Sequence, residues 1–242
     1  MNMFKNSEIA PKIMRASACA LTALWLAGCS STGYKKGDTA AMTLQDAAAD
    51  VQAESRAIDT TVAALDDLAK NPSGDLRLQF KRYSKSLDRL IAAAKRTDAT
   101  ALRMEQKHTA YFLAWDKELP TINYEAIRSR SEARREEVAR RFETVDKSYR
   151  EAQTVVQPLI DYFEDIRKAL GADLTIGGLT AVKEIVHNAD QNAAKVQGAL
   201  GKLTDDLVAA SSEMSSVAAQ SPGPRSAPTS KSSGKAQTRD GS

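Results

Sequence analysis

Apolar and small residues recur along the chain at alternating spacings of four and three, which is typical of long amphipathic helices. The pattern predicts four helices, at residues 42–70, 75–118, 123–170 and 177–217, separated by segments containing Pro, Gly or Asn. Helices of this length joined by turn-sized connectors fold back on one another. The sequence therefore predicts an all-α fold, an elongated antiparallel four-helix bundle with coiled-coil-like hairpins.

The apolar stripes also predict which side chains form the core. The third stripe continues in phase beyond Pro158, so we expect a kink in that helix rather than its end. The fourth stripe is the most regular, and its members are Leu179, Val182, Val186, Ala189, Ala193, Val196, Leu200, Leu203, Leu207, Ala210, Met214 and Val217.

Both ends of the chain differ in composition from the helical region. Residues 218–242 are rich in Ser, Pro and Lys and have too few apolar side chains to form a core, which predicts a disordered tail. Residues 29–41 are mostly small and polar and include two glycines, which predicts a flexible tether. Only 12 Gly, 7 Pro and 5% aromatic residues occur in the chain, which disfavours a β-rich fold.

The first 28 residues have the pattern of a cleaved signal peptide, with a cationic stretch, an apolar run and small residues before a cysteine. The apolar run of about twelve residues is too short to span a membrane, which takes about 20. The segment Leu26-Ala27-Gly28-Cys29 resembles the bacterial lipobox. This resemblance implies diacylglyceryl transfer to Cys29, cleavage before it, and acylation, for example with palmitate, of the new amino terminus. An ordinary secretory signal is the alternative.

Localisation and partners follow from the same segment. Ser30 follows the cysteine, where lipoproteins retained on the inner membrane typically carry Asp. This favours an outer-membrane lipoprotein that faces the periplasm. Cys19 lies in the signal and Cys29 would be acylated, so we expect no disulfide. Of the net charge of +3, residues 1–28 contribute +2 and residues 215–242 contribute +3, so the body carries −2 and has no basic face for nucleic acid.

The supply of catalytic and metal-binding side chains is small. The chain has two histidines, His108 and His187, which lie on different predicted helices, and no pair with the i, i+4 spacing of a zinc site. We therefore expect no enzyme activity, no metal and no cofactor. A hydrolase using unidentified carboxylates and a carrier for an apolar ligand held between helices remain alternatives.

Polar residues occupy the seam of the predicted hairpin between the second and third helices. A turn near residue 120 gives paired positions whose numbers add to about 240, which brings His108 opposite Ser131 and Arg134, with Tyr111 and Trp115 nearer the turn. One interpretation is a ligand or partner site at the hairpin tip. The other is a buried polar layer that sets the register of the helices.

Several short motifs resemble an uncharacterised bacterial family, catalogued as domain of unknown function 2959. They are Gly74-Asp75-Leu76, Phe112-Leu113-Ala114-Trp115-Asp116-Lys117-Glu118-Leu119, Ile127-Arg128-Ser129-Arg130-Ser131-Glu132, Pro158 and Asp165-Ile166. The resemblance covers roughly residues 42–210. It implies a secreted or lipid-anchored helical protein and offers no catalytic residues. With the lipobox-like segment, it favours an envelope scaffold or protein-interaction module with an envelope protein as partner.

Overall fold

The computed structural model describes residues 33–216. These residues form helices α1 (Gly33–Lys70), α2 (Leu76–Glu118), α3 (Glu125–Ala172) and α4 (Ile176–Met214), and a short 3₁₀ helix η1 (Leu119–Thr121), with no strand among them. The predicted all-α four-helix bundle is confirmed. The predicted signal peptide, Cys29 and the predicted tail at 218–242 lie outside the described residues.

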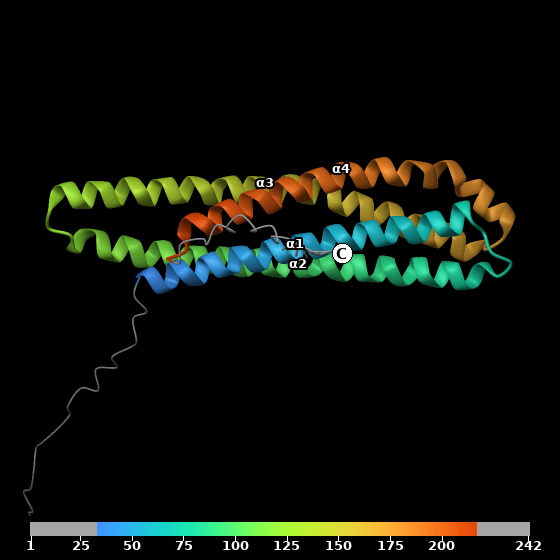
Figure 1. Ribbon diagram of the computed structural model, residues 1–242, viewed down its shortest axis with the longest axis horizontal. Coiled ribbons are helices and arrows are strands. Elements are labelled where there is room, and N and C mark those ends of the chain that lie inside the picture. Colours follow the sequence, from blue (N-terminus) through green and yellow to red (C-terminus); the bar gives the residue numbers. More distant parts are fainter. Residues whose placement is uncertain (1–32, 217–242) are drawn as a thin grey trace, which may run out of the picture. The chain divides into compact units, whose positions relative to one another are not determined.

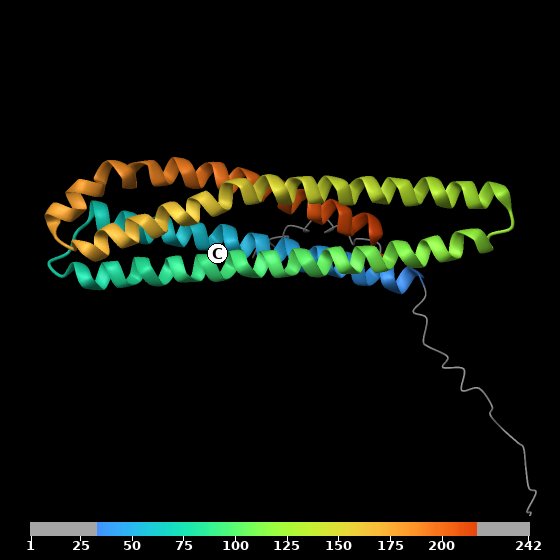
Figure 2. The ribbon, with the colours of Figure 1, turned by 180° about the vertical axis from the view of Figure 1, so that it is seen from behind.

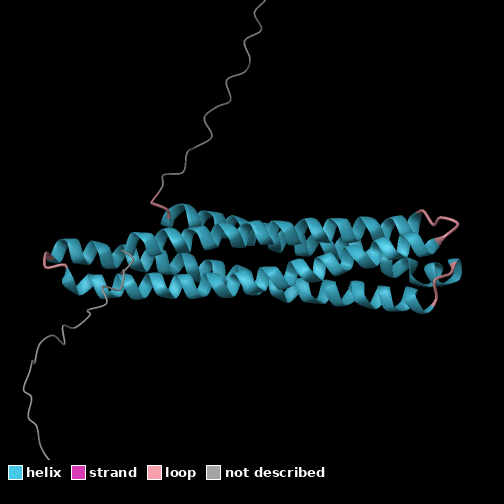
Figure 3. Ribbon diagram, turned by 90° about the horizontal axis from the view of Figure 1, so that it is seen from below, coloured by secondary structure: helices cyan, strands magenta, loops and turns pink. Residues whose placement is uncertain are grey.

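Successive helices run in opposite directions, and α1 packs along both α2 and α4 (Figure 1). The connectors α1–α2 and α3–α4 lie together at one end of the bundle, and the α2–α3 connector lies at the other (Figure 3). We call residues 113–131, which surround the α2–α3 connector, the hairpin tip. It projects past the first turn of α1 (Figures 1 and 2).

The core is a continuous set of apolar side chains along the inside of the four helices. Every member of the predicted fourth stripe from Leu179 to Met214 is buried, and Val217 lies outside the described residues. On α1 the buried face is wide, because α1 contacts two neighbouring helices. It therefore also buries Glu54, Thr61 and Leu68.

Residues 33–41 belong to α1 rather than to a tether, so the predicted flexible segment is wrong at these positions. Gly37 packs against α2 so closely that a Cβ atom there would lie 3.1 Å from Tyr111 Cε2. Ala41 is buried, and its carbonyl accepts a hydrogen bond of 3.0 Å from the Ser211 hydroxyl of α4. The small residues thus let helices approach closely.

Helix α3 continues as a helix through Pro158. Its ribbon changes direction along the yellow segment and descends toward α2 (Figure 2). A proline inside a helix removes one backbone donor and is a common cause of such a bend. The carboxyl-terminal part of α3 therefore lies close to α2.

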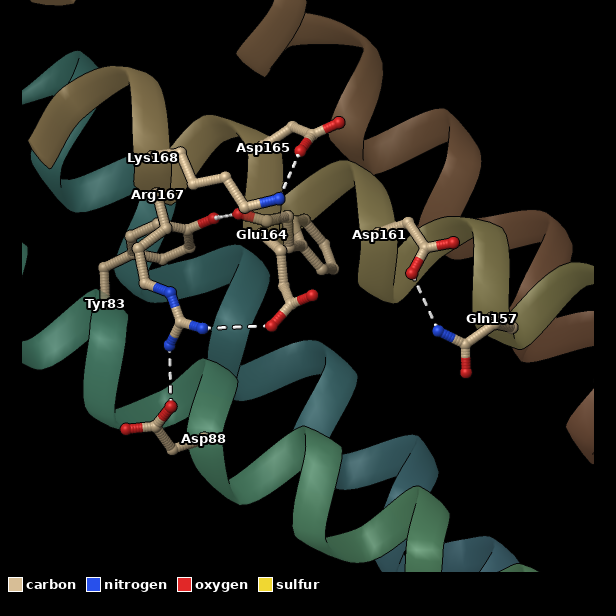
Figure 4. Close-up of polar contacts among 9 residues, drawn as sticks. Tyr83, Asp88, Gln157, Asp161, Glu164, Asp165, Arg167 and Lys168 are labelled. Carbon is tan, nitrogen blue, oxygen red and sulfur yellow. Dashed lines mark hydrogen bonds and ion pairs between the residues drawn. The ribbon is translucent and has the colours of Figure 1, made fainter. Parts of the chain in front are cut away.

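Polar contacts, one of them fully buried, hold α2 and α3 together in this half of the bundle (Figure 4). The fully buried Tyr83 hydroxyl of α2 donates a hydrogen bond of 2.6 Å to the Phe163 carbonyl of α3. The Arg167 guanidinium lies 2.6 Å from Asp88 of α2 and 3.1 Å from Glu164 on its own helix. These contacts fix the separation of α2 and α3 far from the hairpin tip.

Within residues 33–216, no helix combines the length and the apolar character needed to cross a membrane.

Candidate functional site

The register between α2 and α3 differs from the predicted one. The residue numbers of contacting pairs add to 246–251 rather than to about 240. The pairs are Asp98 with Tyr149, Trp115 with Ser131, and Asp116 with Arg135. The reason is the turn, because η1 extends α2 to Thr121 and α3 begins only at Glu125. His108 consequently lies opposite Phe142 instead of Ser131 and Arg134.

Two of the predicted seam residues do meet. Trp115 Nε1 donates a hydrogen bond of 2.9 Å to the Ser131 hydroxyl, and both residues are half-buried. Arg134 turns toward α4, where its Nη2 donates a hydrogen bond of 2.9 Å to the Glu213 carbonyl in the last turn. A cation at this position interacts favourably with the carboxyl-terminal end of a helix. Arg134 therefore ties α3 to α4 and does not join His108.

His108 is stacked on Phe142 with ring centroids 3.8 Å apart and an angle of 14° between the rings. Its other neighbour, Phe112, presents an edge at 4.6 Å. Burial and the nearby Arg135 guanidinium lower the pKa of the His108 imidazole below its ordinary value of 6.5. The ring is therefore neutral at neutral pH and serves as an aromatic surface between the helices.

A groove of about 680 Å³ runs between α2 and α3 on the side of His108, and we call it the α2–α3 groove. It spans residues 98–116 of α2, a length of about 27 Å at 1.5 Å per helical residue. Its lining is formed by Asp98, Ala101, Leu102, Met104, Glu105, His108, Thr109, Phe112, Leu113, Asp116, Arg135, Ala139, Phe142, Glu143, Asp146 and Tyr149.

Polar contacts between α2 and α3 close the groove at each end. At the end far from the tip, the Tyr149 hydroxyl and the Gln153 amide donate hydrogen bonds of 2.7 and 2.9 Å to Asp98. At the tip end, Arg135 forms an ion pair with Asp116, with Nη2 and Oδ2 2.8 Å apart. The groove is thus a bounded feature of a folded hairpin.

The groove combines an apolar floor with acidic edges. Five carboxylates line it, and the one cation among its lining residues, Arg135, is paired with Asp116. Leu102 and Leu113 on α2 also line it and remain 58% and 65% exposed. Exposed leucines between carboxylates form a surface suited to a ligand that carries both apolar and basic groups.

Glu54 is a buried carboxylate that sequence reasoning did not single out. Its side chain on α1 is 0% exposed, and neither carboxylate oxygen has a hydrogen-bond partner. Burial raises the pKa of Glu54 above its ordinary value of 4.5; the nearby Thr97 hydroxyl acts against this rise, and the Asp98 carboxylate adds to it. The sequence did hold a signal for this burial, because Glu54 lies three residues after Val51 and four before Ile58, which is the spacing of a buried helix face.

Among residues 33–216, no group of three or more His, Cys, Asp or Glu side chains is arranged to hold a metal ion.

Comparison with protein families gives one finding that covers the whole helical region. The model described as "Protein of unknown function (DUF2959)" matches residues 26–215, a range that contains all four helices. Comparisons with curated proteins and with solved structures found no significant match.

Proposed function

Since the chain belongs to the DUF2959 family, whose description assigns no activity, we propose that it is a lipid-anchored periplasmic protein that binds an envelope protein as a non-catalytic scaffold or interaction module. The single observation that carries the interaction role is the α2–α3 groove. The anchor is supported by the lipobox-like segment Leu26-Ala27-Gly28-Cys29, and the outer membrane is favoured by Ser30.

The groove indicates the chemistry of the partner. A segment with apolar side chains would cover Leu102, Leu113 and the aromatic floor, and apolar burial contributes about 25 cal/mol per Å². Lysine or arginine side chains beside that apolar stripe would lie near the carboxylates at the edges, which favours association and orients the partner. An amphipathic helix laid into the groove meets both requirements while satisfying its own backbone hydrogen bonds.

Site-specific photo-crosslinking in the native envelope tests this role. A photoreactive residue at Leu102, inside the groove, should give an adduct with one discrete protein. The same residue at Leu78 is the control, because Leu78 lies on the same helix, is similarly exposed at 56%, and does not line the groove. Charge reversal by Glu105→Lys and Glu143→Lys, both on the groove edge, should abolish the adduct at Leu102.

Two results would contradict the proposal. Equal adducts from Leu102 and Leu78 would mean that the contacts are nonspecific. An adduct at Leu102 that persists in the charge-reversed protein would mean that the acidic edges do not recognise the partner.

A carrier for an apolar ligand is the second candidate, and the volume of the groove favours it. A groove of about 680 Å³ lies within the range of small-molecule sites. Mass spectrometry of the protein extracted from its envelope distinguishes the two roles. A stoichiometric lipid that is lost from a Leu102→Lys variant, without a protein adduct at position 102, would favour the carrier.

A further inference from the structure

We propose that the hairpin tip lies against the lipid surface to which the chain is anchored, so that the bundle stands on the membrane on this end. The inference rests on the proposed lipid anchor at Cys29. It goes beyond the anchor because it assigns the protein a second, non-covalent contact with lipid, made by the hairpin tip.

The first observation is that the tip and the beginning of α1 lie at the same end of the bundle. Gly37 in the first turns of α1 packs against Tyr111 of α2. Because α1 and α2 are antiparallel, Gly33 is level with about residue 115 of α2. The α2–α3 connector projects beyond that level, as the green ribbon beyond the blue start of α1 shows (Figure 1).

The second observation is that the anchor is too short to hold the bundle away from the membrane. Only residues 30–32 separate Cys29 from Gly33. The four Cα–Cα steps from Cys29 to Gly33 span at most about 14 Å when the chain is fully extended. The tip extends beyond the level of Gly33 by about seven residues, or about 10 Å at the helical rise of 1.5 Å per residue. If the anchored bundle stands on this end, the tip lies within a few ångströms of the headgroups.

The third observation is the chemistry of the tip. Tyr124 at the N-cap of α3 is 68% exposed, and Ile127 in the first turn is 57% exposed. Tyr124 directly precedes the helix and Ile127 lies in its first turn, so both exposed side chains are at the same end of α3. Tyrosine is enriched at the interface between membrane and water, where its ring and hydroxyl face different surroundings. Lys117 and Arg130 are exposed on the same tip and suit lipid phosphates, but Asp116, Glu118 and Glu125 are exposed there too, so the tip has no net positive charge and the apolar pair makes the main contact.

Depth-dependent quenching in vesicles tests the contact. The processed, lipidated chain is labelled with an environment-sensitive dye through Ile127→Cys and incorporated into vesicles of phosphatidylethanolamine and phosphatidylglycerol that contain a spin-labelled lipid. The matched control is Ile176→Cys, because Ile176 is also an isoleucine in the first turn of a helix and is 59% exposed. It lies at the opposite end, because α3 runs 45 residues from Ile127 to Ala172, about 68 Å at the helical rise of 1.5 Å per residue.

The expected result is strong quenching and a blue shift at position 127 with no quenching at position 176. Equal quenching at both positions would overturn the inference, because the bundle would then lie flat on the membrane. No quenching at either position in a protein that sediments with the vesicles would also overturn it. Failure to sediment at all would instead contradict the anchor at Cys29, so the two proposals fail in distinguishable ways.

Discussion

Glu54 provides the sharpest test of how the bundle is stabilised. Its carboxylate is fully buried in α1 without a hydrogen-bond partner. In the unfolded chain the group titrates near 4.5, whereas burial raises its pKa in the folded protein. Between these two pKa values the unfolded state binds fewer protons than the folded state. The free energy of unfolding therefore falls by about 1.4 kcal/mol per pH unit across that window, and levels off above the folded-state pKa.

Two substitutions separate the charge from the polarity. Glu54→Gln removes only the titration, so its stability should equal that of the wild type near pH 4 and exceed it at about pH 8. Glu54→Met also removes the polar group itself. A buried polar group without a partner destabilises the folded state by about 1–3 kcal/mol, and this penalty is absent from the variant. It should therefore be more stable than the wild type at both pH values. A gain of this size raises the melting temperature by about 2–4 °C per kcal/mol.

Urea unfolding followed by far-ultraviolet circular dichroism at a series of pH values measures these differences. Glu132→Gln is the control, because Glu132 is exposed on α3 and its substitution should leave the pH dependence unchanged. A difference between Glu54→Gln and the wild type that does not grow with pH would refute the reasoning. A variant less stable than the wild type at pH 8 would show that Glu54 has a stabilising partner when charged.

Three further predictions concern the α4 cap, the groove and the anchor. Gly178→Ala should destabilise the protein by about 1–3 kcal/mol in urea unfolding, because its Cβ would lie 2.1 Å from the Asp173 carbonyl oxygen. Gly177→Ala meets only an ordinary contact of 3.5 Å and is the control, and equal losses would contradict the clash. The His108 imidazole should titrate below pH 6.5 in proton NMR, and a midpoint above 6.5 would contradict its burial. Because the folded-state pKa lies below the unfolded one, the free energy of unfolding should fall as the pH drops below 6.5. Cys29→Ser should abolish lipid labelling and leave an uncleaved precursor, whereas unchanged labelling would exclude anchoring there.

The sequence by itself determined the helices of this protein and their order. Residues 76–118 and 176–214 agree with the predicted second and fourth helices to within three residues at each end. Local signals decide these ends, since Asp75 caps α2 by accepting a hydrogen bond from the Arg77 amide and Thr175 caps α4 through the Gly178 amide. The family was also predictable, because its motifs are short runs of sequence.

Tertiary structure alone decided which faces of the helices meet. Residues 33–41 have the composition of a flexible segment, yet Gly37 and Ala41 pack against α2 and α4 because their small size permits close approach. A six-residue connector shifted the register of α2 and α3 by several residues, which placed His108 on Phe142. The groove exists because α2 and α3 are joined by side chains at Asp98–Tyr149 and at Asp116–Arg135 and leave a hollow between these two contacts. Such a separation depends on long-range packing, on which helical periodicity carries no information.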